Sequence, residues 1–92
     1  MTYTVYILFS VSFGKIYIGY THNLIQRFYS HNFLSNKGWT KSFRPWTVIY
    51  TECFRDKSNA LKREKQLKSA KGRQWIWQKI KNELPQRGFI SA

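Results

Sequence analysis

The amino-acid sequence predicts an α+β domain that combines three β-strands with three or more helices. Two apolar runs rich in β-branched and aromatic residues, 3–9 and 15–20, flank a short turn and are typical of a β-hairpin. A third run of this kind covers residues 46–54. The segments that follow the hairpin and the third run have helical spacing instead. At 92 residues, the chain is long enough for one domain with a modest core.

The predicted hairpin places two tyrosines on one surface. Residues 10–14 supply the turn, and Gly14 can adopt the positive φ angle that a hairpin return requires. If the hairpin closes there, Tyr6 and Tyr17 lie near each other on the same face. Gly19 shares this face, and its missing side chain leaves space for a ligand to approach the backbone. The alternative is a hairpin whose tyrosines are ordinary core residues.

The segment after the hairpin, residues 22–32, is predicted to form a helix with Thr21 as its N-cap. Four residues at helical spacing share one face of it: Leu24, Arg27, Phe28 and His31. Because the leucine and the phenylalanine must be buried, the arginine and the histidine point toward the sheet. Arginine is rarely buried without a partner, so this pair favours a functional site. The alternative is an arginine that extends to the rim and a histidine that hydrogen-bonds to the backbone.

Residues 33–44 have no clear periodicity and are predicted to form a long loop, and loops of this length are often functional. Basic and aromatic residues are interleaved in this segment: Lys37, Trp39, Lys41 and Arg44. This pattern suits a nucleic-acid strand, because cations contact phosphates and rings stack on bases. The alternative is a loop that Trp39 fixes to the core.

Two further helices are predicted after the third strand. Asp56 caps the first, and Gly72 separates it from the second, over about 73–84. The second helix is expected to bury Trp75, Ile76 and Ile80. The domain is therefore expected to span residues 1–84, followed by a short tail over 85–92.

Glu64 lies three residues from Leu61 and from Leu67, so it falls in the apolar stripe of its helix. Its carboxylate is one of only four in the chain. One interpretation is a ligand of Mg²⁺, which commonly takes one or two protein carboxylates and keeps several waters. The alternative is a carboxylate paired with a neighbouring lysine or with Arg27. Glu52, at the end of the third strand, is expected to be a solvated charge.

The charge balance predicts a polyanionic partner. The formal net charge is +12, from 16 lysines and arginines against 4 acidic residues. Such an excess favours nucleic acid first and an anionic membrane surface second. The residues expected to contact nucleic acid are Lys15, Lys37, Trp39, Lys41, Arg44, Arg63, Lys68, Lys71 and Arg73.

The cysteine content and the N-terminus indicate a cytoplasmic location. Cys53 is the only cysteine, so it forms no disulfide framework, and with two histidines it cannot build a zinc cluster. We expect it to be a small buried residue in a reducing compartment. No signal peptide is recognised, and no apolar run approaches the ~20 residues of a transmembrane helix.

Several of these residues resemble the signature of the GIY-YIG nuclease superfamily. Tyr17, Ile18 and Gly19 match its second half, whereas Thr4-Val5-Tyr6 stands where Gly-Ile-Tyr is expected and keeps only the tyrosine. The strings KIYIGYT, RPW and ALKREKQLK resemble the small stand-alone bacterial branch, related to the nuclease domain of an excision-repair subunit. Six positions are similar in identity and order to the active-site set: Tyr6, Tyr17, Gly19, Arg27, His31 and Glu64.

The resemblance implies a three-stranded antiparallel sheet flanked by helices and a metal-dependent endonuclease that hydrolyses DNA phosphodiesters. One Mg²⁺ or Mn²⁺ ion is expected on Glu64, and Arg27 is expected to stabilise the phosphoryl charge. Tyr6 would activate or orient the water, Tyr17 would orient the phosphate or water, and His31 would hydrogen-bond a phenol. The resemblance also implies structured or nicked DNA as a partner and a role in repair or recombination. Relatives carry a supporting asparagine, for which Gln74, Gln78 and Asn82 are all candidates here.

Two other functions compete with the nuclease interpretation. A non-catalytic nucleic-acid-binding module would keep the fold and its positive face without cleaving DNA. The aromatic and basic segment over residues 33–44 also suits RNA binding or processing.

Overall fold

The computed structural model describes residues 2–34 and 38–83 of the chain. Its strands are β1 (Tyr3–Ser10), β2 (Lys15–Thr21) and β3 (Thr47–Phe54). Its helical elements are α1 (Leu24–Tyr29), the π-helix η1 (Ser30–Leu34), the 3-10 helix η2 (Trp39–Phe43), α2 (Lys57–Lys68) and α3 (Ala70–Glu83). The strands form one antiparallel sheet in the order β2-β1-β3, which confirms the predicted fold class.

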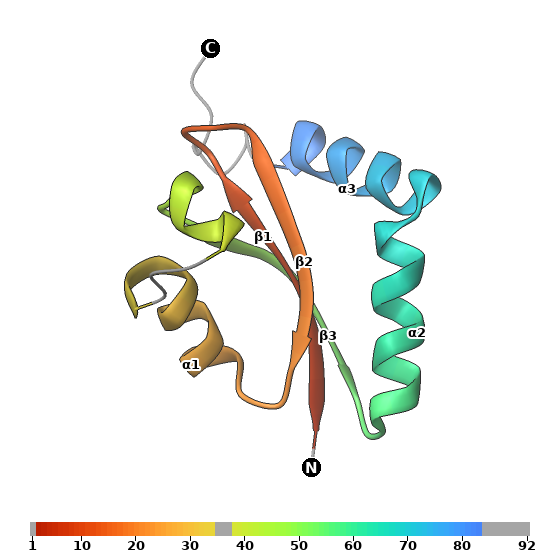
Figure 1. Cartoon of the computed structure of the whole chain (residues 1–92). Helices are drawn as coiled ribbons and strands as arrows, with labels where there is room; N and C mark the ends of the chain where they lie inside the picture. The colour runs from red at the N-terminus through yellow and green to blue at the C-terminus, as the bar shows by residue number, and fades with distance from the viewer. Residues whose placement is uncertain (1, 35–37, 84–92) are drawn as a thin grey trace.

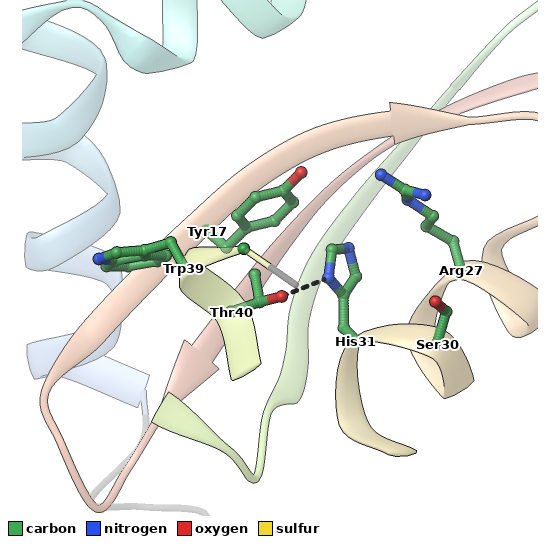
Figure 2. A pocket seen from close by; sticks show the side chains of 7 residues that line it. Tyr17, Arg27, Ser30, His31, Trp39 and Thr40 are labelled. Atoms are coloured by element: carbon green, nitrogen blue, oxygen red, sulfur yellow. Dashed lines mark hydrogen bonds between the residues drawn. The ribbon is translucent and has the colours of Figure 1, made fainter. Parts of the chain in front are cut away.

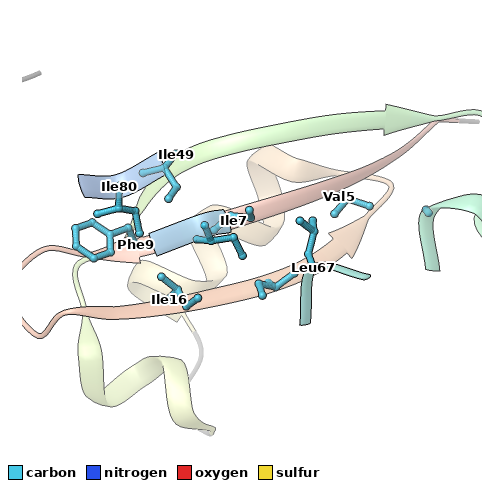
Figure 3. Packing of buried hydrophobic residues seen from close by; sticks show 10 residues of the cluster. Val5, Ile7, Phe9, Ile16, Ile49, Leu67 and Ile80 are labelled. Atoms are coloured by element: carbon cyan, nitrogen blue, oxygen red, sulfur yellow. The ribbon is translucent and has the colours of Figure 1, made fainter. Parts of the chain in front are cut away.

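The central strand β1 is covered on both faces, which explains its nearly continuous apolar sequence. Val5, Ile7 and Phe9 face one side, where they pack with residues of α2 and α3 such as Leu67 and Ile80 (Figure 3). Tyr6 and Leu8 face the other side and pack with Trp46 and with half-buried residues of α1. Helices therefore lie on both sides of the sheet, with α1 on one side and α2 and α3 on the other (Figure 1).

The hairpin register places both tyrosines on the α1 face, as predicted. Tyr6 pairs with Gly19, and Leu8 pairs with Tyr17, so the four side-chain positions share one face. Gly14 closes the turn with φ 63°, and its N–H donates to the carbonyl of Ser10 at 2.8 Å. The turn thus fixes the hairpin register, and the register places Tyr6 and Tyr17 on the same face.

The first helix begins two residues later than predicted. Thr21 is the last residue of β2, and Asn23 is the N-cap, because its Oδ1 accepts from the N–H of Gln26 at 3.1 Å. Leu24 and Phe28 are the residues of the helix that pack against the sheet, as predicted, although each is only half-buried. The helix widens into η1, and this change of pitch places His31 inward, at 5% exposure.

The segment predicted to be a long loop contains the helical turn η2 instead. Trp39 stacks near Trp46, with ring centroids 5.6 Å apart, yet it is 48% exposed. Thr40 is the residue of η2 that is buried, and its carbonyl accepts the Nε1–H of Trp46 at 2.8 Å. The element therefore depends on Thr40 and Trp46 for its position, and Trp39 presents much of its ring to solvent.

The boundary between α2 and α3 falls at Ser69 rather than at Gly72. Asp56 caps α2 as predicted, accepting from the N–H of Asn59 at 2.7 Å. Ser69 ends α2, and its Oγ accepts the N–H of Gly72 at 3.1 Å at the start of α3. Gly72 lies inside α3, where an added Cβ would come within 2.5 Å of Leu67 backbone atoms. The glycine is therefore required for close packing of the two helices, and the prediction that it separates them was wrong.

Three smaller expectations are corrected by the structure. Cys53 is exposed rather than buried, because it alternates outward on the edge strand β3. Trp75 is 42% exposed and contacts Tyr50 edge-on, with centroids 5.2 Å apart. Glu52 is paired rather than solvated, since it accepts from Arg63 Nε at 3.0 Å and from the Tyr50 hydroxyl at 2.9 Å. The expected tail, residues 85–92, lies outside the described residues.

Candidate active site

A hollow of about 200 Å³ opens on the α1 face of the sheet, beside β2. Its lining comes from β2, α1, η1 and the start of η2: Tyr17, Arg27, Ser30, His31, Gly38, Trp39 and Thr40. Figure 2 shows the Tyr17 hydroxyl and the Arg27 guanidinium directed toward one another, with the His31 ring next to both. Polar groups from four separate elements therefore converge on a space suited to a small anionic group such as a phosphate.

A hydrogen-bonded chain connects the buried phenol to this hollow. The Tyr6 hydroxyl lies 3.0 Å from His31 Nε2, and His31 Nδ1 lies 3.2 Å from Thr40 Oγ1. Tyr6 is 1% exposed, whereas Tyr17 is half-buried and reaches the hollow directly. The Tyr17 ring lies 4.6 Å from the His31 ring, centroid to centroid. Tyr6, Tyr17 and His31 thus form one contiguous group, as the sequence predicted.

The protonation states of this group follow from burial and from the nearby cations. Burial raises the pKa of the Tyr6 phenol, the negative charge that Tyr17 would carry raises it further, and Arg27 opposes the rise. Burial also lowers the pKa of His31 to about 4, with smaller contributions from the charges of Arg27 and Arg44. Hydrogen bonding to the Tyr6 phenol is the main cause that raises the pKa of Arg27. At neutral pH the site therefore holds a neutral phenol, a neutral imidazole and a guanidinium.

Two residues hold His31 and its neighbours in place: Asn32, which the sequence did not single out, and Arg44. The side chain of Asn32 accepts the backbone N–H of Trp46 at 2.6 Å and donates to its carbonyl at 3.1 Å. Arg44, predicted to contact nucleic acid, donates from Nε to the carbonyl of His31 at 2.6 Å and from Nη2 to that of Ser30 at 3.4 Å. These contacts join residues 13 or 14 positions apart, so no local sequence pattern reveals them.

Gly19 is where the Tyr6 side chain crosses β2. A Cβ atom on Gly19 would lie 2.8 Å from the Tyr6 hydroxyl oxygen, 2.9 Å from its Cζ and 3.0 Å from Tyr17 Cε1. The sequence predicted a close approach at this glycine, with a ligand as the approaching group. In the structure the two phenols already occupy that space. Gly19 thus sets how closely both tyrosines lie against the strand.

Glu64 lies on the other side of the sheet from this hollow (Figure 1), and the structure does not bring it into the lining with the phenols. It belongs to α2, which covers the opposite face, and its side chain is 14% exposed. Lys68 Nζ lies 3.3 Å from Glu64 Oε1. Lys68 lines a second hollow of about 260 Å³ with Tyr17, Trp39, Arg73 and two isoleucines of β2. Tyr17 and Trp39 line both hollows, so Lys68 adjoins the phenol group, whereas Glu64 lines neither hollow and hydrogen-bonds to neither phenol among the described residues.

The other predicted nucleic-acid contacts are spread over the molecule. Arg73 lines the hollow of Lys68, and Lys15 places Nζ 5.5 Å from the centroid of the Phe43 ring. Lys41 and Lys71 are exposed, and Lys37 lies outside the described residues. Arg63 instead pairs with Glu52 of β3, at the opposite edge of the sheet from β2. The structure therefore gathers only part of this set next to the phenols.

The candidates for a supporting amide lie on α3. Gln74 is exposed, and so are Gln78 and Asn82, whose side chains form a hydrogen bond with each other at 3.2 Å.

The part of the chain that the structure describes contains no group of three or more histidine, cysteine or acidic side chains that could hold a metal ion. A cation bound at Glu64 would thus depend on water and substrate oxygens for its other ligands.

Comparison with known proteins identifies the family. A model of the GIY-YIG catalytic domain matches residues 2–81. The chain belongs to the GIY-YIG family. GIY-YIG domains are nuclease domains that typically use a divalent metal, so this chain carries a domain of nuclease type with nucleic acid as its substrate class. The departure from the signature at Thr4 and Val5 does not remove it from the family.

Similar proteins support the GIY-YIG assignment. The UPF0213 protein of Staphylococcus haemolyticus is 38% identical over 56 residues, which cover 61% of this chain and 68% of that protein. A UPF0213 protein of Bacillus pumilus is 32% identical over 71 residues, which cover 77% of this chain and 65% of that protein. The solution NMR structure of a UPF0213 protein from Bacillus halodurans has a TM-score of 0.51 at 24% identity, over 85% of this chain and 84% of that one. This structure confirms the fold, and these relatives' names state no activity.

None of the helices between residues 2–34 and 38–83 has the length and hydropathy needed to cross a bilayer. The apolar exposed residues of α1, Ile25 and Tyr29, lie on a helix of only 6 residues.

The depressed pKa of His31 predicts a loss of stability in acid. Folding lowers this pKa from 6.5 to about 4, so between these values the unfolded chain binds a proton that the folded chain does not. The free energy of unfolding should therefore fall by roughly 2–3 kcal/mol as the pH drops from 6.5 toward 4. Urea unfolding at a series of pH values measures this. The drop should shrink in His31→Gln and persist in His22→Gln, which alters the exposed histidine. Equal pH dependence in both variants would contradict the prediction.

Proposed function

We propose that this protein is an endonuclease that hydrolyses DNA phosphodiester bonds with one divalent cation, Mg²⁺ or Mn²⁺. The observation that carries the proposal is the contiguous group formed by Tyr6, Tyr17, Arg27 and His31 around a phosphate-sized hollow. Membership of a nuclease family and a net charge of +12 support a polyanionic substrate. We further propose that the substrate is structured or nicked DNA. The protein would act in DNA repair or recombination in the cytoplasm.

In this mechanism Arg27 binds the scissile phosphate. Its guanidinium lies on the rim of the hollow, near both phenols, and its planar fork can donate two parallel hydrogen bonds to phosphoryl oxygens. The charge that develops on those oxygens during attack is stabilised by the same donors. Tyr17, which also lines the hollow, orients the phosphate or the attacking water.

The Tyr6–His31 pair accepts the proton of the attacking water. A phenol with an ordinary pKa of about 10 is a poor base, and burial makes Tyr6 a poorer one. The neutral imidazole gives the phenol proton an acceptor if Nδ1–H donates to Thr40 and Nε2 accepts from Tyr6, although the lowered pKa of His31 makes this imidazole a weak base as well. Tyr6 then passes its own proton to His31 as it takes the proton of the water. The water oxygen bonds to phosphorus, the bond to the leaving 3′ oxygen breaks, and that oxygen takes a proton from solvent. His31 then releases its extra proton to solvent, which restores the starting state.

Glu64 is the residue that would hold the cation. A carboxylate is the ligand type that Mg²⁺ and Mn²⁺ prefer, and this one is largely covered by protein, which limits competition from solvent. When bound, the ion supplies Lewis-acid stabilisation of phosphoryl and leaving-group oxygens. With one such carboxylate at the β2 side of α2, a single ion fits the donor set better than two.

A nuclease assay over a panel of DNA forms tests the proposal. Linear, supercoiled, nicked, flapped and branched DNA are incubated with the purified chain in Mg²⁺, in Mn²⁺ or in EDTA. We expect strand cleavage of at least one form in either metal and none in EDTA. Cleavage that is equal in EDTA would contradict the one-metal mechanism.

The competing function is a non-catalytic nucleic-acid-binding module. One observation favours it: Glu64 already has an ion-pair partner, as in a purely structural pair. Binding of DNA with no cleavage of any form in the same panel would establish this function. Adding single-stranded RNA as a competitor would show whether RNA is the preferred ligand.

A further inference from the structure

Glu64 and Lys68 form an ion pair one helical turn apart on α2. Lys68 Nζ lies 3.3 Å from Glu64 Oε1, and the two side chains differ sharply in exposure, 47% for the lysine and 14% for the glutamate. Helical spacing of i and i+4 keeps the two groups on one face. The lysine is thus the accessible partner of a carboxylate that is otherwise largely covered.

Lys68 also adjoins the phenol group. It lines a hollow with Tyr17, Trp39 and Arg73, and two of these residues, Tyr17 and Trp39, line the hollow that contains Arg27 and His31. A cation held by Glu64 would therefore lie next to the Lys68 ammonium.

The ammonium and such a cation compete for the same oxygen. Both are positive and would repel each other strongly at contact distance, so the carboxylate cannot serve both fully. Lysine has a flexible chain and a compact charge, which let the ammonium move away by a change of rotamer. Its own hollow, which it shares with Arg73, offers a position where a substrate phosphate would meet two cations.

Taking Glu64 as the cation ligand of the proposed function, we propose that Lys68 is a positioning residue that occupies this carboxylate until the cation enters. In the metal-free protein Lys68 neutralises Glu64 and contributes little to DNA binding. Entry of the cation releases the ammonium toward the substrate phosphate in the adjoining hollow. Lys68 thereby weakens cation binding in the absence of DNA, and the affinity for the cation becomes coupled to the presence of substrate.

Mn²⁺ binding to the DNA-free protein tests whether Lys68 weakens cation binding at Glu64. Unbound Mn²⁺ is followed by electron paramagnetic resonance during titration of the parent chain, Lys68→Gln, Lys65→Gln and Glu64→Gln. Lys65 is the matched control, an exposed lysine of the same helix whose side chain points to another face than that of Glu64. We expect Lys68→Gln to bind Mn²⁺ about fivefold or more tightly than the parent, and Lys65→Gln to change affinity by less than about twofold.

DNA binding in EDTA tests whether Lys68 contributes little to DNA binding in the metal-free protein. Without a cation, Lys68 should stay paired with Glu64. Lys68→Gln should weaken this binding no more than Lys65→Gln does, whereas an ordinary phosphate-binding lysine would weaken it more. The inference is overturned if Lys68→Gln binds Mn²⁺ no more tightly than the parent while Glu64→Gln abolishes binding. If Glu64→Gln binds Mn²⁺ like the parent, or if no chain binds it, Glu64 is not the ligand and the one-metal mechanism fails as well.

Discussion

Replacing Glu64 with glutamine is expected to lower Mg²⁺-dependent DNA cleavage by at least about a thousandfold, because the amide loses the charge that holds the cation. Glutamine has nearly the same size as glutamate, so the fold should be kept. The measurement is the initial rate of cleavage of the DNA form that the parent cuts best. DNA binding should be retained, since removing a negative charge near Lys68 does not weaken attraction to phosphates.

Glu52→Gln is the matched control for this change. Glu52 is also a partly covered glutamate in an ion pair, with Arg63 at 3.0 Å, and lies on β3 at the opposite edge of the sheet from β2. Its substitution removes the same charge. The cleavage rate should stay within about threefold of that of the parent, because a partly exposed ion pair contributes little to stability. Cleavage by Glu64→Gln at a rate similar to that of Glu52→Gln would remove Glu64 from the proposed mechanism.

Replacing Gly19 with alanine is expected to reduce both stability and cleavage. The added Cβ would lie 2.8 Å from the Tyr6 hydroxyl oxygen, and Tyr6 is too tightly buried, at 1% exposure, to move freely. Overpacking of this kind costs about 1–3 kcal/mol. A phenol displaced from His31 by about 1 Å should lower the cleavage rate by roughly a hundredfold. Urea unfolding and the same cleavage assay measure the two effects.

The sign of the stability change separates this contact from ordinary strand preference. Glycine weakens a strand, so without the contact alanine would stabilise the protein. Tyr6→Phe removes the hydroxyl that the new Cβ meets most closely. The double variant Tyr6→Phe/Gly19→Ala should therefore be more stable than the sum of the two single changes predicts. A Gly19→Ala protein that is as stable and as active as the parent would contradict the proposed role of this glycine.

Much of the fold could be predicted because its signals are local. The alternation of side chains along β1 and β2 and the turn at Gly14 are enough to place Tyr6, Tyr17 and Gly19 on one face. The aspartate cap of α2 was predicted, but the asparagine and serine caps were harder to assign, since neighbouring polar residues compete for the same backbone donors. Thr21 and Gly72 were misassigned for this reason: Asn23 and Ser69 make the capping hydrogen bonds instead.

The candidate site was predictable as a set of residues but not as an arrangement. Arg27 and His31 were placed on the sheet-facing side by helical spacing, yet α1 ends at Tyr29, and η1 rather than a regular helix turns His31 inward. Thr40 and Asn32 were missed because each acts through partners distant in the sequence, His31 and Trp46. A single polar residue that makes such contacts leaves no periodic signal.

By itself, the sequence determined the class of the fold, the face shared by the two phenols and the identity of the six candidate residues, because strand alternation and helix spacing act over a few neighbouring positions. Only the tertiary structure decided that Tyr6 is buried against Gly19 and hydrogen-bonded to His31, and that Glu64 lies on the helix of the opposite face with Lys68 as its partner. These outcomes depend on how the helices cross the sheet. That crossing is set by the packing of many side chains together, and no short stretch of the chain encodes it.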